Sequence, residues 1–156
     1  MVSICRYSGS YGREFCRYIY IKEFISPDFE VKHTIVTMKD SREVTNNTRE
    51  EIVASIKKSK SDNIIITHGT YTMVETAKFI EKRFQEFPTK KIILIGSFWP
   101  LKWYSPSDAP FNIGFAMGAI SGIQPGIYVA MHSTLFAPHE VEKDVEHAHF
   151  WRKKAG

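Results

Sequence analysis

The chain has 156 residues, of which 43% are hydrophobic and 24% are charged, and its formal net charge is +4 at pH 7. This length and composition suit one globular domain with a sizeable core and exclude an intrinsically disordered chain. The basic residues gather only in short clusters, so we expect no nucleic-acid partner.

Cysteine and histidine usage argues against a disulfide framework and against a metal site. Cys5 and Cys16 are the only cysteines, too few to crosslink a domain of this length, and we expect both to be reduced thiols. His147 and His149 are two residues apart, and the other histidines show no ligand spacing. We therefore expect neither a metal nor another cofactor.

The sequence also carries no targeting or membrane signal. Arg6, Arg13 and Arg17 interrupt the region where the apolar part of a secretory signal would lie. No apolar stretch is long enough to span a membrane. We expect no membrane partner, and a cytoplasmic location follows by default.

Four short segments rich in β-forming residues are expected to be strands: His33–Met38, Asn63–Thr67, Lys91–Gly96 and Gly126–Met131. Two of them contain continuous apolar runs, Ile64–Ile66 and Ile92–Ile95, instead of an alternating pattern. Such runs are typical of strands that are buried on both faces, and these usually belong to a parallel sheet covered by helices.

Three helices are expected between these strands. Thr48-Arg49-Glu50-Glu51 has the capping-box pattern and predicts a helix that begins near Thr48. Thr72-Met73-Val74-Glu75 is a second such pattern, followed by apolar residues at helical spacing. Pro110 suits the first turn of a third helix over Phe111–Ser121, which is rich in small residues. The charged, His-rich tail from Glu140 onward predicts an exposed helix or arm.

The order β-α-β-α-β-α-β predicts an α/β fold: a three-layer, doubly wound domain with a mostly parallel sheet and helices on both faces. No internal repeat or linker interrupts the chain, so residues 1–156 are expected to form a single domain. Ligands of such folds bind beyond the carboxyl ends of the strands. Three loops are expected there: Lys39–Asn47, His68–Tyr71 and Ser97–Asp108.

The loop His68-Gly69-Thr70-Tyr71 joins a buried strand to a capped helix. Its N–H groups, with the helix dipole behind them, suit an anion or a developing oxyanion, and Gly69 permits close backbone approach. Thr70 and Tyr71 add two hydroxyls. The alternative is an ordinary turn in which Thr72 is only a helix cap, and the residues alone leave both interpretations open.

The segment Thr67-His68-Gly69-Thr70-Tyr71-Thr72-Met73, followed by Glu75-Thr76-Ala77, resembles the second signature of bacterial L-asparaginases, T-H-G-T-D-T-M-x-E-T-A. Further matches follow the family's order. Lys39-Asp40-Ser41 resembles its K-D-S substrate loop. Gly96-Ser97 and 107–112 resemble its G-[AS]-M-x-P…S-[AD]-x-P-x-N region, and the stretch 126–143 its closing strand and lysine. The resemblance covers about 33–145, and the chain looks like a version without the family's second domain.

The resemblance implies an amidohydrolase that splits the amide of asparagine or a related small carboxylate. By motif, Thr70 corresponds to the second catalytic threonine and Lys143 to its relay lysine, while Ser41, Gly69 and Ser97 fall at substrate-binding positions. A lysine acts as a base only if burial or a positive neighbour lowers its pKa from about 10.4. The alternative for Lys143 is a solvated side chain among the charges of the tail.

Two departures from the family pattern bear on activity. Tyr71 stands where the family has an aspartate that receives the substrate's ammonium group, and a neutral phenol cannot replace that charge. Arg42 can instead grip a carboxylate, or be an ordinary surface charge beside Glu43. The family's nucleophile motif T-G-G-T is also missing. Ser10, in the string 7–12, is a candidate substitute nucleophile, and an ordinary polar turn is the alternative.

Two functions therefore stay open. The first is an asparaginase-type amidohydrolase with an altered site that uses Thr70, Lys143, Tyr71 and Ser10. The second is a catalytically inactive relative that binds a small carboxylate or serves as an oligomeric scaffold. The small residues of 111–121 and the aromatics Phe98, Trp99, Trp103 and Tyr104 predict a homodimer or homotetramer, and a lid or an internal core is the alternative for the aromatics.

Overall fold

The computed structural model describes residues 27–99, 106–144 and 146–153. In chain order the elements of these ranges are the 3-10 helix η2 (Ser41–Glu43), α2 (Asn46–Lys58), β1 (Asn63–Thr67), α3 (Met73–Glu81), the 3-10 helix η3 (Phe84–Glu86), β2 (Lys91–Ile95), α4 (Ala109–Ala119), β3 (Gly126–Met131), β4 (Thr134–Phe136), β5 (Val141–Asp144) and β6 (His149–Arg152).

The main sheet has the strand order β1-β2-β3-β4. The first three strands are parallel: Ile65 lies beside Ile93, and Ile93 lies beside Tyr128. β4 turns back antiparallel to β3, with Ala130 opposite Leu135. The prediction of a mostly parallel sheet is therefore confirmed, and the antiparallel edge strand is an addition that the sequence did not indicate.

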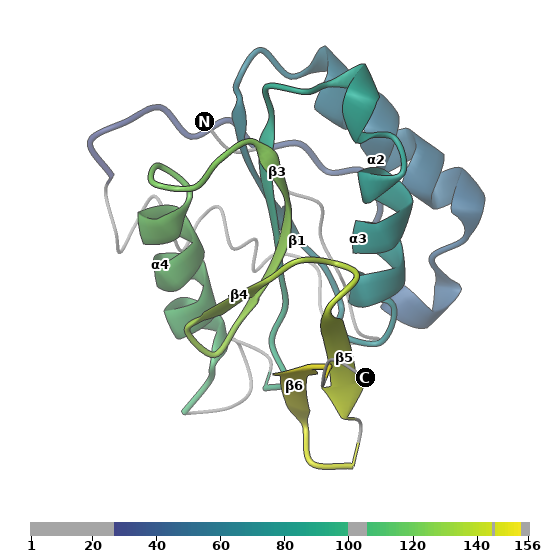
Figure 1. The fold of residues 1–156 in the computed structure, drawn as a ribbon, viewed down its shortest axis with the longest axis vertical. Helices are drawn as coiled ribbons and strands as arrows, with labels where there is room; N and C mark the ends of the chain where they lie inside the picture. Colours follow the sequence, from purple (N-terminus) through teal and green to yellow (C-terminus); the bar gives the residue numbers. More distant parts are fainter. Residues whose placement is uncertain (1–26, 100–105, 145, 154–156) are drawn as a thin grey trace.

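Helices cover both faces of this sheet, as Figure 1 shows: α4 lies on one face, and α2 and α3 lie on the other. Ile64 and Ile66 contribute to the core under α2 and α3, whereas Ile65 contributes to the core under α4. Because successive strand residues point to opposite faces, a strand covered on both sides must be apolar at every position. The three-layer α/β architecture predicted from the isoleucine runs is confirmed.

The prediction of a helix that begins near Thr48 is confirmed by α2, but its capping residue differs from the prediction. The helix begins at Asn46, and its N-cap is Thr45, whose hydroxyl accepts a hydrogen bond from the Thr48 N–H at 3.4 Å. Thr48 therefore lies inside the first turn, where it is buried. The predicted cap at Thr48 was wrong because Thr45, three residues earlier, offers the same capping chemistry.

The third helix also begins earlier than predicted. It spans Ala109–Ala119 instead of Phe111–Ser121, with Pro110 in its first turn. Proline suits this position because its missing N–H has no partner at the start of a helix.

The predicted strand at His33–Met38 is not one, since the structure assigns no strand to these residues. Ile35 is 53% exposed and Met38 is 38% exposed. High β propensity describes how well a side chain fits a half-buried pleated surface, and these apolar side chains do not lie on one.

The tail beyond Glu140 is a β-hairpin and not the predicted helix or arm. β5 and β6 pair antiparallel, with Lys143 opposite Phe150. Val141 and Phe150 are buried in the core cluster shared with α2 and α3. Charged residues between them hid the pattern, because only two apolar side chains anchor the hairpin.

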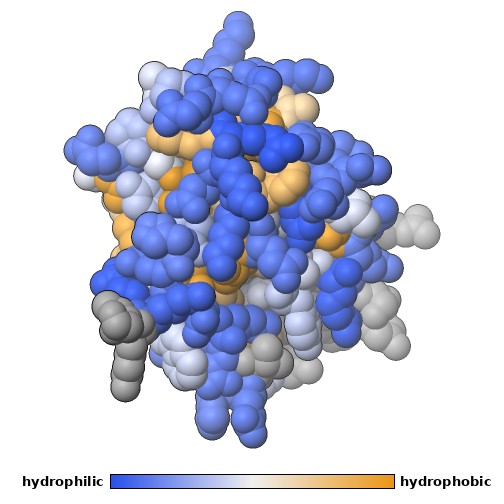
Figure 2. Space-filling view, turned by 45° about the vertical axis from the view of Figure 1, so that its right-hand side comes forward, coloured by the Kyte–Doolittle hydropathy of each residue, from blue (hydrophilic) through white to orange (hydrophobic). Residues whose placement is uncertain are grey.

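The side of the molecule that carries α2 and α3 faces the viewer more directly in Figure 2, where hydrophilic residues cover most of the surface and apolar residues show only in small patches. Within the ranges that the structure describes, no helix combines the length and the apolar character needed to cross a membrane.

Candidate functional site

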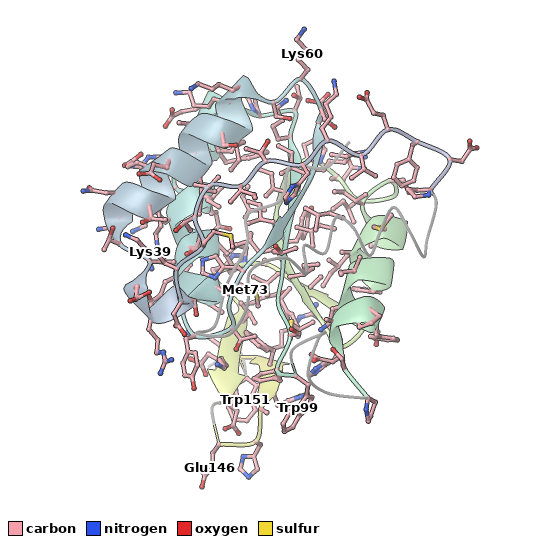
Figure 3. All side chains as sticks on the ribbon, turned by 180° about the vertical axis from the view of Figure 1, so that it is seen from behind. Lys39, Lys60, Met73, Trp99, Glu146 and Trp151 are labelled. Atoms are coloured by element: carbon pink, nitrogen blue, oxygen red, sulfur yellow. The ribbon has the colours of Figure 1, made fainter. Side chains whose placement is uncertain are left out.

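The candidate site lies at the carboxyl end of the parallel sheet. His68 follows β1 directly, and its N–H donates to the Ile95 carbonyl at 2.8 Å, which prolongs the pairing of β1 with β2. In Figure 3, Trp99, which follows β2, lies near the end of the molecule that carries the β5–β6 hairpin. Lys60, which precedes β1, lies at the opposite end. The loop 68–71 thus emerges at the end to which the hairpin also belongs.

Gly96 allows this loop to lie directly on the end of β2. A Cβ atom at Gly96 would come within 2.8 Å of Thr70 Cγ2 and 2.9 Å of the His68 carbonyl oxygen. Contacts this short would force the loop to shift, so its close approach to β2 depends on glycine at this position. The close approach leaves the Thr70 side chain only 8% exposed.

Lys143, on β5, reaches across to Thr70. Its Nζ donates to Thr70 Oγ1 at 3.1 Å. Burial lowers the pKa of Lys143 below its ordinary value of 10.5. The structure therefore brings together the two residues that the family resemblance pairs, with a lysine whose environment favours the neutral amine more than water does.

Tyr71 lies beside two cations. Lys143 Nζ is 4.2 Å from the centroid of the Tyr71 ring, and Arg42 Cζ is 5.0 Å from it. Both distances are within the range of cation–π attraction. Tyr71 is itself 53% exposed, so its ring stands at the surface above the buried Thr70 hydroxyl.

Arg42 is held by a neighbour on its own segment. Its Nε and a terminal nitrogen donate to the two carboxylate oxygens of Asp40 at 3.0 and 2.9 Å. Asp40 also caps η2, where it forms a capping box with Glu43. Arg42 was predicted to grip a ligand carboxylate. In this structure its fork engages Asp40, an arrangement that the K-D-S-R string did not reveal.

Ser41 connects η2 to the start of α3. Its carbonyl accepts a hydrogen bond of 2.6 Å from the Thr72 hydroxyl. Thr72 occupies the N-cap position of α3 but makes no side-chain cap, so the predicted second capping box is wrong: this hydroxyl binds a different segment. Ser41 is 1% exposed, and among the described residues its Oγ is buried without a hydrogen-bond partner.

A buried network of hydrogen bonds connects the loop 68–71 to α2 and α3. Arg49 Nε donates to Thr76 Oγ1 at 3.2 Å, and Thr76 Oγ1 lies 3.0 Å from His68 Nε2. His68 Nδ1 lies 2.8 Å from the Gly69 carbonyl, and it donates there because a carbonyl can only accept. In the neutral ring Nε2 is then the acceptor, and the Thr76 hydroxyl donates to it. This network could not be predicted from the sequence because Arg49 and Thr76 are 27 positions apart. Arg49 also forms an ion pair with Glu75.

Asn112 ties three elements together at the same edge. Its side-chain amide donates to the Gly96 carbonyl at 3.0 Å, and its Oδ1 accepts from the His132 N–H at 3.0 Å. It is fully buried. It also donates to Asp108, which accepts hydrogen bonds from the N–H groups of Phe98 and Trp99. The loop after β2, which begins at Ser97, is therefore fixed from α4.

Phe98 extends the site toward the hairpin. Its ring centroid is 5.3 Å from Lys143 Nζ and 5.7 Å from the ring of Phe150. Ser97 beside it is half-buried. The predicted residues Thr70, Tyr71, Lys143 and Arg42 are thus joined by direct contacts, and Ser41 joins them through Thr72. Ser10, Trp103 and Tyr104 lie outside the described residues.

In the described part of the chain, no three histidine, cysteine or acidic side chains are grouped so as to hold a metal ion. The groups of the candidate site that can act chemically are the Thr70 hydroxyl, the Lys143 amine, the Tyr71 phenol and the Ser41 hydroxyl.

Comparisons with known proteins find asparaginases. The glutaminase-asparaginase of Acinetobacter glutaminasificans is 35% identical over 98 residues, which cover 60% of this chain and 29% of that protein. L-asparaginase 2 of Escherichia coli (strain K12) is 32% identical over 87 residues, covering 54% of this chain and 24% of that protein. The matched stretches therefore span less than a third of the length of these relatives.

A solved structure shares the fold. The probable cytoplasmic L-asparaginase of Campylobacter jejuni superposes with a TM-score of 0.78 at 21% identity, over 98% of this chain and 53% of that one. The family model described as "Asparaginase, N-terminal" matches residues 13–149. Because this match spans most of the sequence and includes the loop 68–71 and Lys143, the chain belongs to the asparaginase family.

Proposed function

We propose that this chain is an asparaginase-type amidohydrolase that splits the amide of a small carboxylate at Thr70 and Lys143. The observation that carries the proposal is the 3.1 Å contact between Lys143 Nζ and Thr70 Oγ1. A neutral lysine amine at this distance can take the hydroxyl proton, and the lowered pKa of Lys143 makes that form more accessible.

In the proposed reaction a hydroxyl oxygen adds to the amide carbon, the C–N bond breaks, and the leaving nitrogen takes a proton and departs as ammonia. Water then cleaves the resulting ester and releases the carboxylate. Thr70 and Lys143 supply and accept the protons. The attacking hydroxyl is proposed to come from Ser10, as the sequence suggests, or from Thr70 itself.

The ligand is proposed to lie against Ser41 as well. A buried hydroxyl that lacks a hydrogen-bond partner is costly, and a polar group of a ligand would supply the missing bond. The hydrogen bond from the Thr72 hydroxyl to the Ser41 carbonyl keeps Ser41, and with it the Ser41 hydroxyl, near the loop that carries Thr70.

A second copy of the chain is proposed as a partner, in a homodimer or homotetramer. Phe111 on α4 is 57% exposed, and Cβ atoms built at Gly114 and Gly118 would meet open space. An exposed helix face without charged residues suits a close subunit contact. Light scattering should give a mass of at least two chains at micromolar concentration, and a single-chain mass would contradict the proposal. A cytoplasmic location is also proposed, because the Campylobacter jejuni protein that shares the fold is a probable cytoplasmic L-asparaginase.

Ammonia release from L-asparagine, L-glutamine, succinamate and glutaramate tests the activity. Thr70→Val removes the hydroxyl but keeps the methyl group that lies on Gly96, and Lys143→Met removes the amine. Each should lower the rate by about 10²- to 10⁴-fold. Lys153→Met is a matched control and should keep native activity, since the Lys153 amine pairs with Glu142 on the same hairpin and no contact with Thr70 or Lys143 is seen among the described residues. Turnover that survives both site substitutions would contradict the proposal.

The alternative, an inactive relative that binds a small carboxylate, is favoured by one observation. The rings of Tyr71 and Phe98 lie near Lys143 Nζ, and their faces attract the charged ammonium rather than the neutral base. Ligand binding without ammonia release from any of the four amides would support this alternative. Loss of turnover in Ser10→Ala would instead support catalysis with Ser10 as the nucleophile.

A further inference from the structure

We propose that this site selects a ligand that has a carboxylate but no ammonium group beside it, and that Tyr71 sets this choice. The substrate class is then the monoamide of an unsubstituted dicarboxylic acid, of which succinamate is the simplest suitable member. The amide part of this statement rests on the proposed function, whereas the selection between charged groups does not.

The charges around Thr70 and Tyr71 carry the inference. Among the described residues, the charged groups that contact these two side chains are both cations: Lys143 contacts Thr70 and the Tyr71 ring, and Arg42 contacts the Tyr71 ring. A ligand ammonium next to Tyr71 would therefore lie near the positive charge of Lys143, whereas the charge of Arg42 is largely balanced by Asp40. A ligand carboxylate in the same place would be attracted by Lys143.

The nearest acid on this segment is already engaged. Both carboxylate oxygens of Asp40 accept hydrogen bonds from Arg42, at 3.0 and 2.9 Å. A ligand ammonium at Asp40 would have to share this carboxylate with the Arg42 guanidinium, which lies beside it with the same sign of charge. Such bidentate pairs are among the stronger and more specific ones, so Asp40 is a poor substitute for a dedicated acid.

Tyr71 itself cannot supply a negative charge at neutral pH, because a phenol with an ordinary pKa near 10 is not ionised there. Its ring face also attracts the cations already present, Lys143 at 4.2 Å and Arg42 at 5.0 Å. An added ammonium would compete with them for the ring. A carboxylate would not compete, because it would bind the cations directly.

Because Tyr71 is exposed, it can be substituted with little effect on folding. The side chain is 53% exposed, so its replacement should not disturb the core. Tyr71→Asp introduces the missing negative charge beside Lys143 and Arg42. Tyr71→Phe is the matched control, since it keeps the ring and the cation contacts and removes only the hydroxyl.

The test is calorimetric titration of the full chain at pH 7 with succinate and with L-aspartate, which differ only in the ammonium group. Succinate should bind at least about tenfold more tightly to the native chain and to Tyr71→Phe, as expected for one unfavourable charge contact near a surface. In Tyr71→Asp the ratio should move toward L-aspartate by about tenfold or more. Equal or tighter binding of L-aspartate by the native chain, or no binding of either ligand, would overturn the inference.

Ammonia release from succinamate and L-asparagine separates this inference from the proposed function. Selective succinate binding without release from either amide would mean that the charge selection holds and that the amidohydrolase proposal fails. Release from L-asparagine at a higher rate than from succinamate would mean the reverse.

Discussion

Lys143 Nζ lies 3.1 Å from Thr70 Oγ1 although 73 residues separate the two in the sequence. Two separate structural features bring these side chains together. Gly96 lets the loop that carries Thr70 descend onto the end of β2, and the β5–β6 hairpin, anchored by Val141 and Phe150, carries Lys143 to it. The geometry of the candidate site therefore depends on Gly96, Val141 and Phe150 as well as on Thr70 and Lys143 themselves.

Gly96→Ala should damage the site directly. The added Cβ would lie 2.8 Å from Thr70 Cγ2 and 2.9 Å from the His68 carbonyl, so the loop must move outward. We expect a loss of about 1–3 kcal/mol in the free energy of unfolding, as for other overpacked positions, and at least about a tenfold loss of activity. Urea denaturation and the ammonia assay measure the two effects.

Gly122→Ala provides the control for this substitution. A Cβ at Gly122 would lie 3.8 Å from the Ala119 carbonyl oxygen, which is an ordinary contact. Its stability and activity should stay near the native values. If Gly96→Ala behaves like Gly122→Ala, the tight approach is not what positions Thr70.

Thr76→Val should weaken the support under the loop. It removes the hydroxyl that accepts from Arg49 Nε and donates to His68 Nε2, so two hydrogen bonds are lost at a fully buried position. We expect a loss of about 1–3 kcal/mol in the free energy of unfolding. Thr89→Val removes an exposed hydrogen bond to Asp62 and should cost no more than about 0.5 kcal/mol. Equal losses in the two variants would show that the buried hydrogen bonds of Thr76 stabilise the fold no more than the exposed hydrogen bond of Thr89 does.

The pH dependence of activity should report Lys143. Burial lowers the pKa of Lys143 below 10.5, and the proposed mechanism needs the neutral amine. The rate should therefore rise with pH, with a midpoint below 10.5. Lys143→Arg should lose this rise, because a guanidinium stays protonated throughout the range. A rising limb that is unchanged in Lys143→Arg would assign the titration to another group.

The same lowered pKa also has a consequence for stability. Between the folded and unfolded pKa values of Lys143, the unfolded chain binds more protons than the native one, so this residue makes the free energy of unfolding increase with pH in that window. Lys143→Met should flatten the increase there.

As the pH falls, the β5–β6 hairpin should unfold locally before the main sheet does. The pKa of Glu140 is lowered by the Ala137 N–H and by Arg152, that of Glu142 by Lys153 and Trp151, and that of Asp144 by His147. Carboxylates with a lowered pKa stabilise the fold above their ordinary values of 4.5 for Glu and 3.8 for Asp, and this stabilisation is lost as the pH falls through the lowered values.

Hydrogen exchange measures this release. At about pH 3, amides of β5 and β6 should lose protection while those of β1 and β2, which are buried on both faces, keep it. Activity should disappear with the hairpin, since β5 carries Lys143. Simultaneous loss of protection in β2 and in the hairpin would mean that the hairpin does not open as a separate unit.

The sequence predicted the sheet well because the isoleucine runs of β1 and β2 leave few alternatives. A run of apolar side chains along a strand is typical of a parallel sheet covered on both faces. β1 and β2 do pair in parallel, and the structure sets Ile65 beside Ile93. Local chemistry predicted the helix starts less accurately. Thr45, Thr48 and Thr72 all resemble N-caps, and only their surroundings decide which hydroxyl caps a helix.

The site was predictable where ordered motifs resemble the family, and not where it depends on long-range contacts. Nothing in the local sequence indicates that Arg49 would support His68 through Thr76, or that Arg42 would bind Asp40 while it contacts Tyr71. The hairpin was missed because its strands are short and mostly charged, and their pairing depends on the burial of Val141 and Phe150. Ser10 as a nucleophile remains a prediction from the sequence.

The central claim, that Thr70 and Lys143 act as one catalytic pair, is tested most directly by a double-mutant cycle on ammonia release. The rates of the native chain, Thr70→Val, Lys143→Met and the double variant are compared on the amide that the native chain hydrolyses fastest. If the two residues act as a unit, each single substitution should lower the rate by about 10²- to 10⁴-fold, and the double variant should be hardly slower than the singles. Losses that multiply in the double variant, or a native chain that releases no ammonia from any of the four amides, would contradict the account.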